Sequence, residues 1–374
     1  MEGGLSDVAQ LFVELAAIPS PSGREREVAD RVTDYLRALA LPVDEDDAGS
    51  KIDSAMGNIL CRVEPTVEGT PLFFCAHLDT VPVEAGIEPV VEDGVVRNAQ
   101  ASILGADDKS AVATMLEATR RVVAENRPHA GIELLFTPKE EVGLRGADAF
   151  DASRLAARVG YVYDHAGPVG EVILGAPYQR KLDVVFRGRS AHAGMYPEEG
   201  RSAIAAAARA IADLRLGRLD DETTANVGQI VGGTARNVVP ERCAFAAEAR
   251  CHDEAKLGEL VQEMLETIAF AAQVADCDVE TKVEGHARGY RFKRDDAPVL
   301  LAVSALERAG VQPTFGLSGG GADANVFNDR GLQCLNLANG MTDIHTPAER
   351  IALEDLDRMV DVTLALIEVA RDAA

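Results

Sequence analysis

The sequence predicts an α/β protein in which a mostly parallel sheet, flanked by helices, is interrupted by an inserted α+β domain. Strand-like and helix-like segments alternate over the first half of the chain, as is typical of a parallel sheet. Near Tyr178 the pattern changes to the order β-α-β-β-α-β, which is the split βαβ unit. The first pattern then returns. We therefore expect a discontinuous domain (1–177 and 289–374) around an insert (178–288).

The first half of the chain supplies the clearest strand and helix patterns. Two amphipathic helices are expected over residues 5–18 and 23–40. Four strands and one long helix are expected at "NILCRV", "PLFFCAH", "DKSAVATMLEATRRVVAEN" (the helix), "IELLFTP" and "VGYVYD". Ligands of α/β sheets gather at the carboxyl ends of the strands. His77, Glu140 and Asp164 each lie where such a strand ends.

The insert and the end of the chain follow the same logic. In the insert, the four expected strands are "KLDVVFRG", "TANVGQIVGG", "CAFAAEARCH" and "DVETKVEG", and the two expected helices are "GRSAIAAAARAIADLRLGRL" and "DEAKLGELVQEMLETIAFAAQVAD". After the insert, "APVLLAVSALERAG", "ANVFNDRG", "LQCLNLA" and "LEDLDRMVDVTLALIEVARD" resume the alternation of helix and strand.

Composition excludes some classes of partner. The formal net charge is -24, from 61 acidic and 37 basic residues, which argues against a nucleic acid or an anionic membrane as the partner. No apolar run approaches membrane-spanning length, and the first residues lack the basic and apolar parts of a secretory signal. The six cysteines are scattered without a C-x-x-C pair, which is typical of reduced thiols. We expect a cytoplasmic protein.

Five short stretches place metal-binding side chains at strand ends or turns. They are "HLDT" (His77, Asp79), "GADDKS" (Asp107, Asp108), "TPKEEVG" (Glu140, Glu141), "VYDHAG" (Asp164, His165) and "TDIHTPAE" (His345). Taken singly, each has an ordinary structural explanation, such as a helix N-cap for an aspartate or a solvated turn for the paired glutamates. Together, their nitrogen and carboxylate donors suit zinc or a similar divalent transition ion.

Two neighbouring pairs suggest a division of roles. The side chains of Glu140 and Glu141 diverge if the segment is extended, so one can bind a metal ion while the other stays free as a general base. Asp79 is placed to accept a hydrogen bond from the second ring nitrogen of His77, which would fix the tautomer of a metal-binding histidine.

The chain resembles a known family of enzymes in a series of motifs. "AHLDTVP", "GADDKSA", "TPKEEVGLRGA", "YDHAGPVG", "SAHAGMYPEEGRSAI", "GGTARNVVPE" and "IHTPAE" occur in order. They resemble the co-catalytic zinc peptidases that include peptidase T, aminoacylase and succinyl-diaminopimelate desuccinylase. "GADDK" and "DHAGPVGEV" favour the peptidase T-like branch. The motifs are jointly specific, although none is specific alone.

The resemblance implies a set of metal ligands. His77 and Asp164 would bind one zinc ion, Glu141 and His345 the other, and Asp107 would bridge the two. His165, beside Asp164, is an alternative donor at that position. The peptide bond after the bridging aspartate would be cis.

The resemblance also implies catalytic and substrate-binding residues. Glu140 would be the catalytic base, and Asp79 would orient His77. The insert would serve as a lid and dimerisation domain, in which His192 stabilises the oxyanion, while Asn237 and Arg250 reach the substrate. Independently of the resemblance, the glycines of "GLSGGGAD" permit close approach of a substrate to backbone amides such as that of Gly320, and a plain tight turn is the alternative.

The implied function is that of a zinc-dependent aminopeptidase. It would remove the N-terminal residue from di- or tripeptides with water activated by two zinc ions, for which manganese or cobalt are alternatives. Homodimers would form through the insert. Because a split βαβ sheet has exposed edges that can pair with a second copy, we also expect His192 to act in the partner's site, with a solvated His192 as the alternative. An N-acyl amino acid deacylase, a carboxypeptidase and a catalytically inactive metal-binding dimer remain open as alternatives on the same scaffold.

Overall fold

The computed structural model describes residues 5–285 and 288–373, which form two compact units. One unit contains the chain up to Gly175 and again from Phe292, and the other contains Ala176–Arg291. The sequence places these divisions after residues 177 and 288, two and three residues away from the observed ones. Each unit encloses a hydrophobic core of its own.

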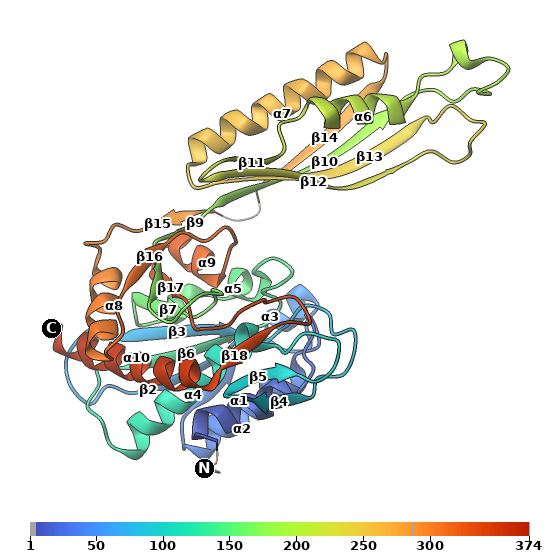
Figure 1. The fold of residues 1–374 in the computed structure, drawn as a ribbon. Helices are drawn as coiled ribbons and strands as arrows, with labels where there is room; N and C mark the ends of the chain where they lie inside the picture. The colour runs from blue at the N-terminus through green and yellow to red at the C-terminus, as the bar shows by residue number, and fades with distance from the viewer. Residues whose placement is uncertain (1–4, 286–287, 374) are drawn as a thin grey trace. The chain divides into compact units, whose positions relative to one another are not determined.

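The first unit is built on an eight-stranded sheet (Figure 1). In spatial order its strands are β1 (Val43–Glu45), β2 (Ile59–Val63), β6 (Ile132–Thr137), β3 (Leu72–His77), β7 (Val159–Val162), β17 (Gln333–Leu337), β8 (Glu171–Ile173) and β16 (Thr314–Gly316). The central strands β6, β3, β7 and β17 are parallel to one another, and antiparallel pairs occur toward the edges. The α/β class with a mostly parallel sheet is confirmed.

Helices cover this sheet and account for the burial of its central strands. They are α1 (Asp7–Ala16), α2 (Arg26–Ala38), α3 (Ala48–Ile52), α4 (Ala106–Ala124), α5 (Arg145–Ala149), α8 (Ala297–Arg308), α9 (Asp323–Asp329) and α10 (Leu353–Asp372), with a short 3₁₀ turn η1 (Ala152–Arg154). All six residues of β3 are buried. The ring of Phe73 packs edge-on against Phe327 of α9, 5.4 Å between centroids, whereas its neighbour Phe74 lies in the core that contains α4.

A small sheet stands beside the entrance to α4. It consists of β4 (Pro89–Glu92), β5 (Val95–Asn98) and β18 (Arg350–Ala352), with β5 in the centre. Because β18 directly precedes α10, this sheet ties the end of the chain to the segment that leads into α4.

The second unit is an antiparallel sheet covered on one face by two helices (Figure 1). Its strands lie in the order β11 (Gly217–Asp220), β12 (Thr223–Gly232), β13 (Arg242–Cys251), β10 (Tyr178–Arg187) and β14 (Asp278–Gly285). The helices are α6 (Ala203–Asp213) and α7 (Glu254–Val274), and a 3₁₀ turn η2 (Pro197–Glu199) follows β10. The predicted β-α-β-β-α-β order is present with one additional strand, β11, between α6 and β12.

One element boundary in this unit differs from the sequence prediction. The first helix was expected to reach Leu219, but α6 ends at Asp213 and residues 217–220 form β11 instead. Leu214 is already extended, and Gly217 has φ +84, a conformation that ends the helical course of the chain.

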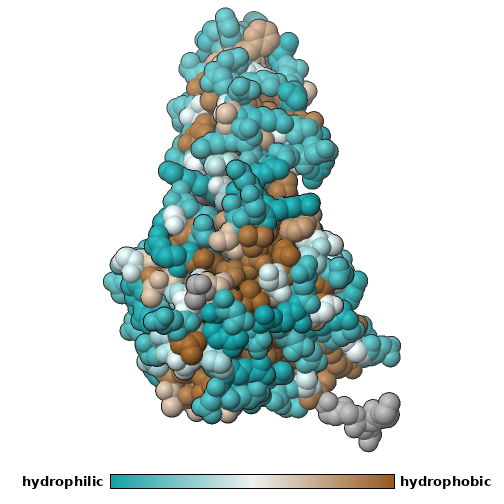
Figure 2. All heavy atoms as spheres, turned by 90° about the vertical axis from the view of Figure 1, so that its left-hand side faces the viewer, coloured by the Kyte–Doolittle hydropathy of each residue, from teal (hydrophilic) through white to brown (hydrophobic). Residues whose placement is uncertain are grey.

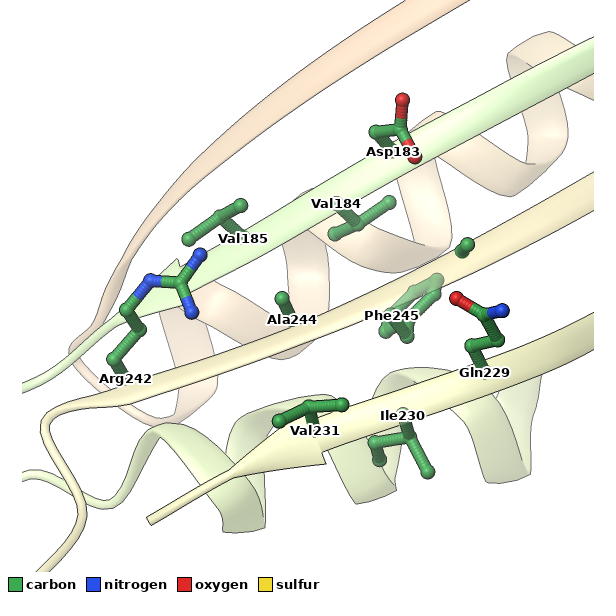
Figure 3. A pocket seen from close by; sticks show the side chains of 10 residues that line it. Asp183, Val184, Val185, Gln229, Ile230, Val231, Arg242, Ala244 and Phe245 are labelled. Carbon is green, nitrogen blue, oxygen red and sulfur yellow. The ribbon is translucent and has the colours of Figure 1, made fainter. Parts of the chain in front are cut away.

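The other face of this sheet is open and carries a shallow depression of about 270 Å³ (Figure 3). Apolar side chains of Val185, Ile230 and Val231 line it, together with Arg242 and Asp183. None of the residues expected to carry chemistry lines this depression.

The surface agrees with the acidic composition. Figure 2 shows one face of the molecule, over most of which hydrophilic side chains predominate. In the part of the chain that the structure describes, every helix is too short or too polar to span a lipid bilayer.

Candidate active site

Three adjacent parallel strands bring the predicted site residues to one edge of the large sheet. His77 ends β3 and is in register with Thr137, which ends β6, while Cys75 is in register with Val162 at the end of β7. The segments that follow these strands carry Asp79, the paired glutamates and Asp164. The sheet therefore gathers the motifs as the sequence predicted.

His77 is buried and held at both ring nitrogens. Its Nδ1 lies 2.8 Å from the backbone oxygen of Asp79, and its Nε2 lies 3.1 Å from Oδ1 of Asp107. The carboxylate of Asp79, expected to orient this ring, is 3.6 Å from Nδ1, so the backbone oxygen is the closer acceptor. A carbonyl oxygen can only accept a hydrogen bond, so the proton of neutral His77 lies on Nδ1 and the lone pair on Nε2, facing the cluster.

Asp107 joins the two histidines of the cluster. Its Oδ1 faces His77, and its Oδ2 lies 3.2 Å from Nε2 of His345. The same nitrogen of His345 lies 3.0 Å from Oε1 of Glu141. The peptide bond between Asp107 and Asp108 is cis, as the resemblance implied. A carboxylate with one oxygen directed at each of two donor groups has the arrangement that a bridging ligand requires.

Asp164 belongs to a second group of donors. Donor atoms of His77, Glu140 and Asp164 all lie within 4.8 Å of one another, as do those of His77, Asp107 and Glu141. Asn336 on β17 fixes the backbone of Asp164, because its side chain binds the N–H at 3.1 Å and the carbonyl oxygen at 2.7 Å. His165 belongs to neither group among the described residues.

The electrostatics of the cluster favour positive charge at its centre. Hydrogen bonds to Asp107 and Glu141 raise the pKa of His345 to about 10. Burial alone would lower the pKa of His77, but its contacts with Asp107 and Asp79 outweigh burial and raise it well above the usual value. Burial, and then the charge of a nearby carboxylate, raise the pKa values of Glu140 and Asp164. These are the surroundings in which divalent cations are stabilised.

The carboxylate of Asp79 has a role that the sequence did not suggest. It accepts the backbone N–H of Glu140 at Oδ1, 2.8 Å away, and the N–H of Glu141 at Oδ2, 3.2 Å away. Asp79 is completely buried. It therefore holds the turn that presents both glutamates.

Sequence reasoning missed two buried acids close to the cluster. Glu349 accepts the N–H groups of Leu104, Gly105 and Asp107 at 2.7, 2.9 and 3.0 Å, and so fixes the entrance to α4. Asp323 accepts the hydroxyl of Thr137 at 2.5 Å, and burial raises its pKa to about 6. Both end motifs described above, "IHTPAE" and "GLSGGGAD", in which the histidine and the glycines give the stronger sequence signal.

The amide of Gly320, expected to meet the substrate, is engaged within its own loop. Its N–H donates to Oγ of Ser318 at 3.0 Å. The structure gives this amide a structural partner, and its contact with a substrate stays a prediction.

The remaining predicted residues lie in the second unit. His192 is exposed, and its Nδ1 accepts the N–H groups of Gly194 and Met195 at 3.2 and 3.1 Å, which leaves a proton on Nε2. The N–H of Ala193 donates to the backbone oxygen of Asn237 at 2.9 Å, so these two predicted residues are neighbours.

Arg250 occupies a different part of that unit. It lies on β13, where its Nε donates to Oε1 of Glu248 at 3.1 Å. It pairs with Gln179 near the start of β10, whereas the loop that carries His192 follows the end of that strand. The three residues thus fall at opposite ends of one sheet.

Comparison with known proteins assigns the family. The model of peptidase family M20/M25/M40 matches residues 73–369, which include every proposed residue of the cluster. The chain belongs to this family. As an M20 peptidase it is a hydrolase, and members of its family depend on metal ions.

Similar proteins place this M20 peptidase in the peptidase T-like branch. The crystal structure of aminopeptidase PepT from Bacillus cereus is 38% identical, covers 97% of this chain and 98% of that one, and has a TM-score of 0.91. The structure of a tripeptidase from Staphylococcus aureus is 32% identical, covers 99% and 100%, and has a TM-score of 0.94. The uncharacterized protein YqjE of Bacillus subtilis is 38% identical over 359 residues, 96% of this chain and 97% of that protein.

The residues of this M20 peptidase fit a metal centre. The cluster combines two imidazole nitrogens with four carboxylates, a donor set that zinc and related divalent ions accept. The Nε2 lone pair of His77 is directed by the hydrogen bond at Nδ1.

Proposed function

We propose that this chain is a zinc-dependent aminopeptidase that removes the N-terminal residue from di- or tripeptides in the cytoplasm. The observation that carries the proposal is the placement of Asp107, whose two oxygens face His77 and His345. Support for the substrate class comes from the two solved relatives above 30% identity, an aminopeptidase and a tripeptidase.

The proposed ligands divide the cluster into two metal positions. His77 and Asp164 would bind one ion, and Glu141 and His345 would bind the other. Asp107 would bind both ions. When bound, such ions supply Lewis acidity, which makes water a nucleophile at neutral pH and polarises the scissile carbonyl. Three protein ligands for each ion leave positions open for water and substrate.

Glu140 is the proposed general base. Its donor atoms lie close enough to His77 and Asp164 to bind an ion, so proximity alone does not separate the two roles. We assign it as the base because Asp107 already completes three ligands at that position, and because Glu140 is 8% exposed. Burial and the charge of Asp164 raise its pKa, which suits a carboxylate that must take a proton from water and pass it to the leaving amine.

Roles in the second unit follow from side-chain chemistry. His192 would donate the Nε2 proton to the oxyanion, as its tautomer allows. Asn237 offers an amide next to it, and the guanidinium of Arg250 suits a substrate carboxylate. The unit would also form the contact between two subunits of a homodimer.

A matched substrate panel tests the proposal. Protein loaded with zinc, manganese or cobalt is assayed against a tripeptide with a free amino group, its N-acetylated form and an N-acetyl amino acid. We expect hydrolysis of the free tripeptide at its first peptide bond, loss of activity after chelation, and recovery on adding zinc. Preference for the acetylated substrates, or release of the C-terminal residue, would assign a deacylase or a carboxypeptidase instead.

A further inference from the structure

The backbone of the turn that carries the paired glutamates is hydrogen-bonded to two buried carboxylates. The backbone N–H groups of Glu140 and Glu141 donate to Asp79, and the N–H of the preceding Lys139 donates to Oε1 of Glu25 at 3.3 Å. Glu25 and Asp79 are both fully buried. Three successive amides are thus bound by side chains from elsewhere in the sequence, and the position of the Glu140 carboxylate depends on where these two acids stand.

A segment near the start of the chain fixes one of these acids directly. The hydroxyl of Ser22 donates to Oδ2 of Asp79 at 2.5 Å. This is the same oxygen that accepts the N–H of Glu141, whereas Oδ1 accepts that of Glu140. A carboxylate held at both oxygens cannot rotate without breaking a charge-assisted hydrogen bond.

The backbone around Ser22 is itself anchored beside Asp79. Its N–H donates to the carbonyl of Thr80 at 3.2 Å, and the N–H of Thr80 donates to the carbonyl of Ser20 at 2.9 Å. Glu25 binds the N–H of Gly23 at 2.6 Å and the hydroxyl of Ser54 at 2.9 Å. The segment from Ser20 to Glu25 is therefore held in a fixed position relative to Asp79.

We propose that Ser22 is a positioning residue for the peptidase reaction. Its hydroxyl sets the orientation of the Asp79 carboxylate, which in turn sets the turn that presents Glu140 as base and Glu141 as ligand. The catalytic part of this inference rests on the proposed function, but the positioning part concerns the turn alone. No motif of the resemblance includes Ser22, which lies fifty-seven residues before Asp79 in sequence.

The chain offers a close control in Ser20. It is a buried serine on the same segment, and its hydroxyl finds no hydrogen-bond partner among the described residues. Ser20→Ala and Ser22→Ala therefore make the same chemical change two residues apart, and only one of them removes a bond to Asp79. Ser22→Thr keeps the hydroxyl.

The experiment measures both catalysis and the turn itself. For Ser22→Ala we expect kcat to fall about 10- to 100-fold with KM within about twofold, because the base is displaced while the substrate still binds. The assays are run with excess zinc, because Glu141, a proposed ligand, lies on the same turn. Amide hydrogen exchange in a peptide covering residues 138–144 should become faster. Ser22→Thr should restore both readouts, and Ser20→Ala should change neither.

The outcomes separate this inference from the proposed function. Wild-type kcat and exchange in Ser22→Ala would overturn the inference, as would equal effects of Ser20→Ala. If the wild type hydrolyses no peptide, the proposed function fails, and hydrogen exchange at 138–144 still decides whether Ser22 holds the turn.

Discussion

At the scale of single residues, the paired glutamates show how neighbours in sequence acquire different chemistry. Glu141 lies 3.0 Å from Nε2 of His345, with its carboxylate at the cluster, while Glu140 is buried beside Asp164. The turn formed after β6 separates the two side chains, and Asp79 holds both of their amides. The same local sequence would therefore supply one ligand and one proton acceptor under the proposed function.

Substitution of each glutamate by glutamine should separate these functions. Glu140→Gln should lower kcat by about 10²–10⁴-fold, the usual contribution of a general base, while metal content stays near that of the wild type. Glu141→Gln should lose metal as well as activity, because an amide is a poorer ligand than a carboxylate. Elemental analysis by mass spectrometry alongside kcat provides the measurement. Equal loss of metal from both variants would refute the assignment.

At the scale of elements, the entrance to α4 depends on a residue from the other end of the chain. Asp107 lies in the first turn of α4. Glu349, just before β18, accepts the backbone N–H groups of Leu104, Gly105 and Asp107. Glu349 is 2% exposed. Without it, three buried amides would lack an acceptor at the point where the bridging carboxylate is placed.

Removal of this acceptor should destabilise the protein in a graded way. Glu349→Ala leaves three donors unpaired, each costing about 1–3 kcal/mol, so the free energy of unfolding should fall by several kcal/mol. Glu349→Gln keeps one acceptor oxygen and should cost less. Glu354→Ala, which breaks an exposed pair with Arg358, should cost under about 1 kcal/mol. Denaturant titrations would compare the three, and an effect of Glu349→Ala no larger than that of Glu354→Ala would contradict the prediction.

Elements with a local sequence pattern were predicted correctly from the sequence. Elements and contacts that depend on pairing between distant segments were not predicted. Central strands and long helices have strong periodicity, so β3, β6 and α4 were found. The three-residue strands β1 and β18 are too short to show a periodic pattern. They form because their backbones pair with the neighbouring strands β2 and β5. Likewise, Glu349 binds backbone groups more than two hundred residues earlier in the chain, and Ser22 binds a side chain 57 residues later. No single stretch of sequence contains both partners of such a contact.

At the scale of the whole molecule, the second unit separates residues that were expected to serve one substrate. Along β13, Arg250 pairs with Gln179 and Arg242 with Arg187. The eight residue steps between Arg250 and Arg242 span about 26 Å of extended strand. His192 follows the Arg187 end, so one copy of this unit cannot bring His192 and Arg250 to the same peptide without a large rearrangement.

We therefore expect His192 to complete the site of a partner subunit. His192→Ala and Glu140→Ala homodimers should both be inactive, but a co-refolded mixture should regain roughly a quarter of wild-type activity, since half of the dimers would be hybrids with one complete site. Sedimentation must first show that dimers form. Hybrid dimers that remain inactive, or a monomeric protein, would place His192 in its own subunit's site or outside the reaction.

The strands β9 (Gly175–Ala176) and β15 (Tyr290–Arg291) pair with each other, and the N–H of Phe292 donates to the carbonyl of Leu174 at 2.6 Å (Figure 1). The polypeptide thus leaves the large sheet and returns to it through one short ladder. A gene segment encoding everything between these strands can be gained, lost or exchanged in a single event without re-routing the host sheet. The two parts of the chain can consequently differ in ancestry.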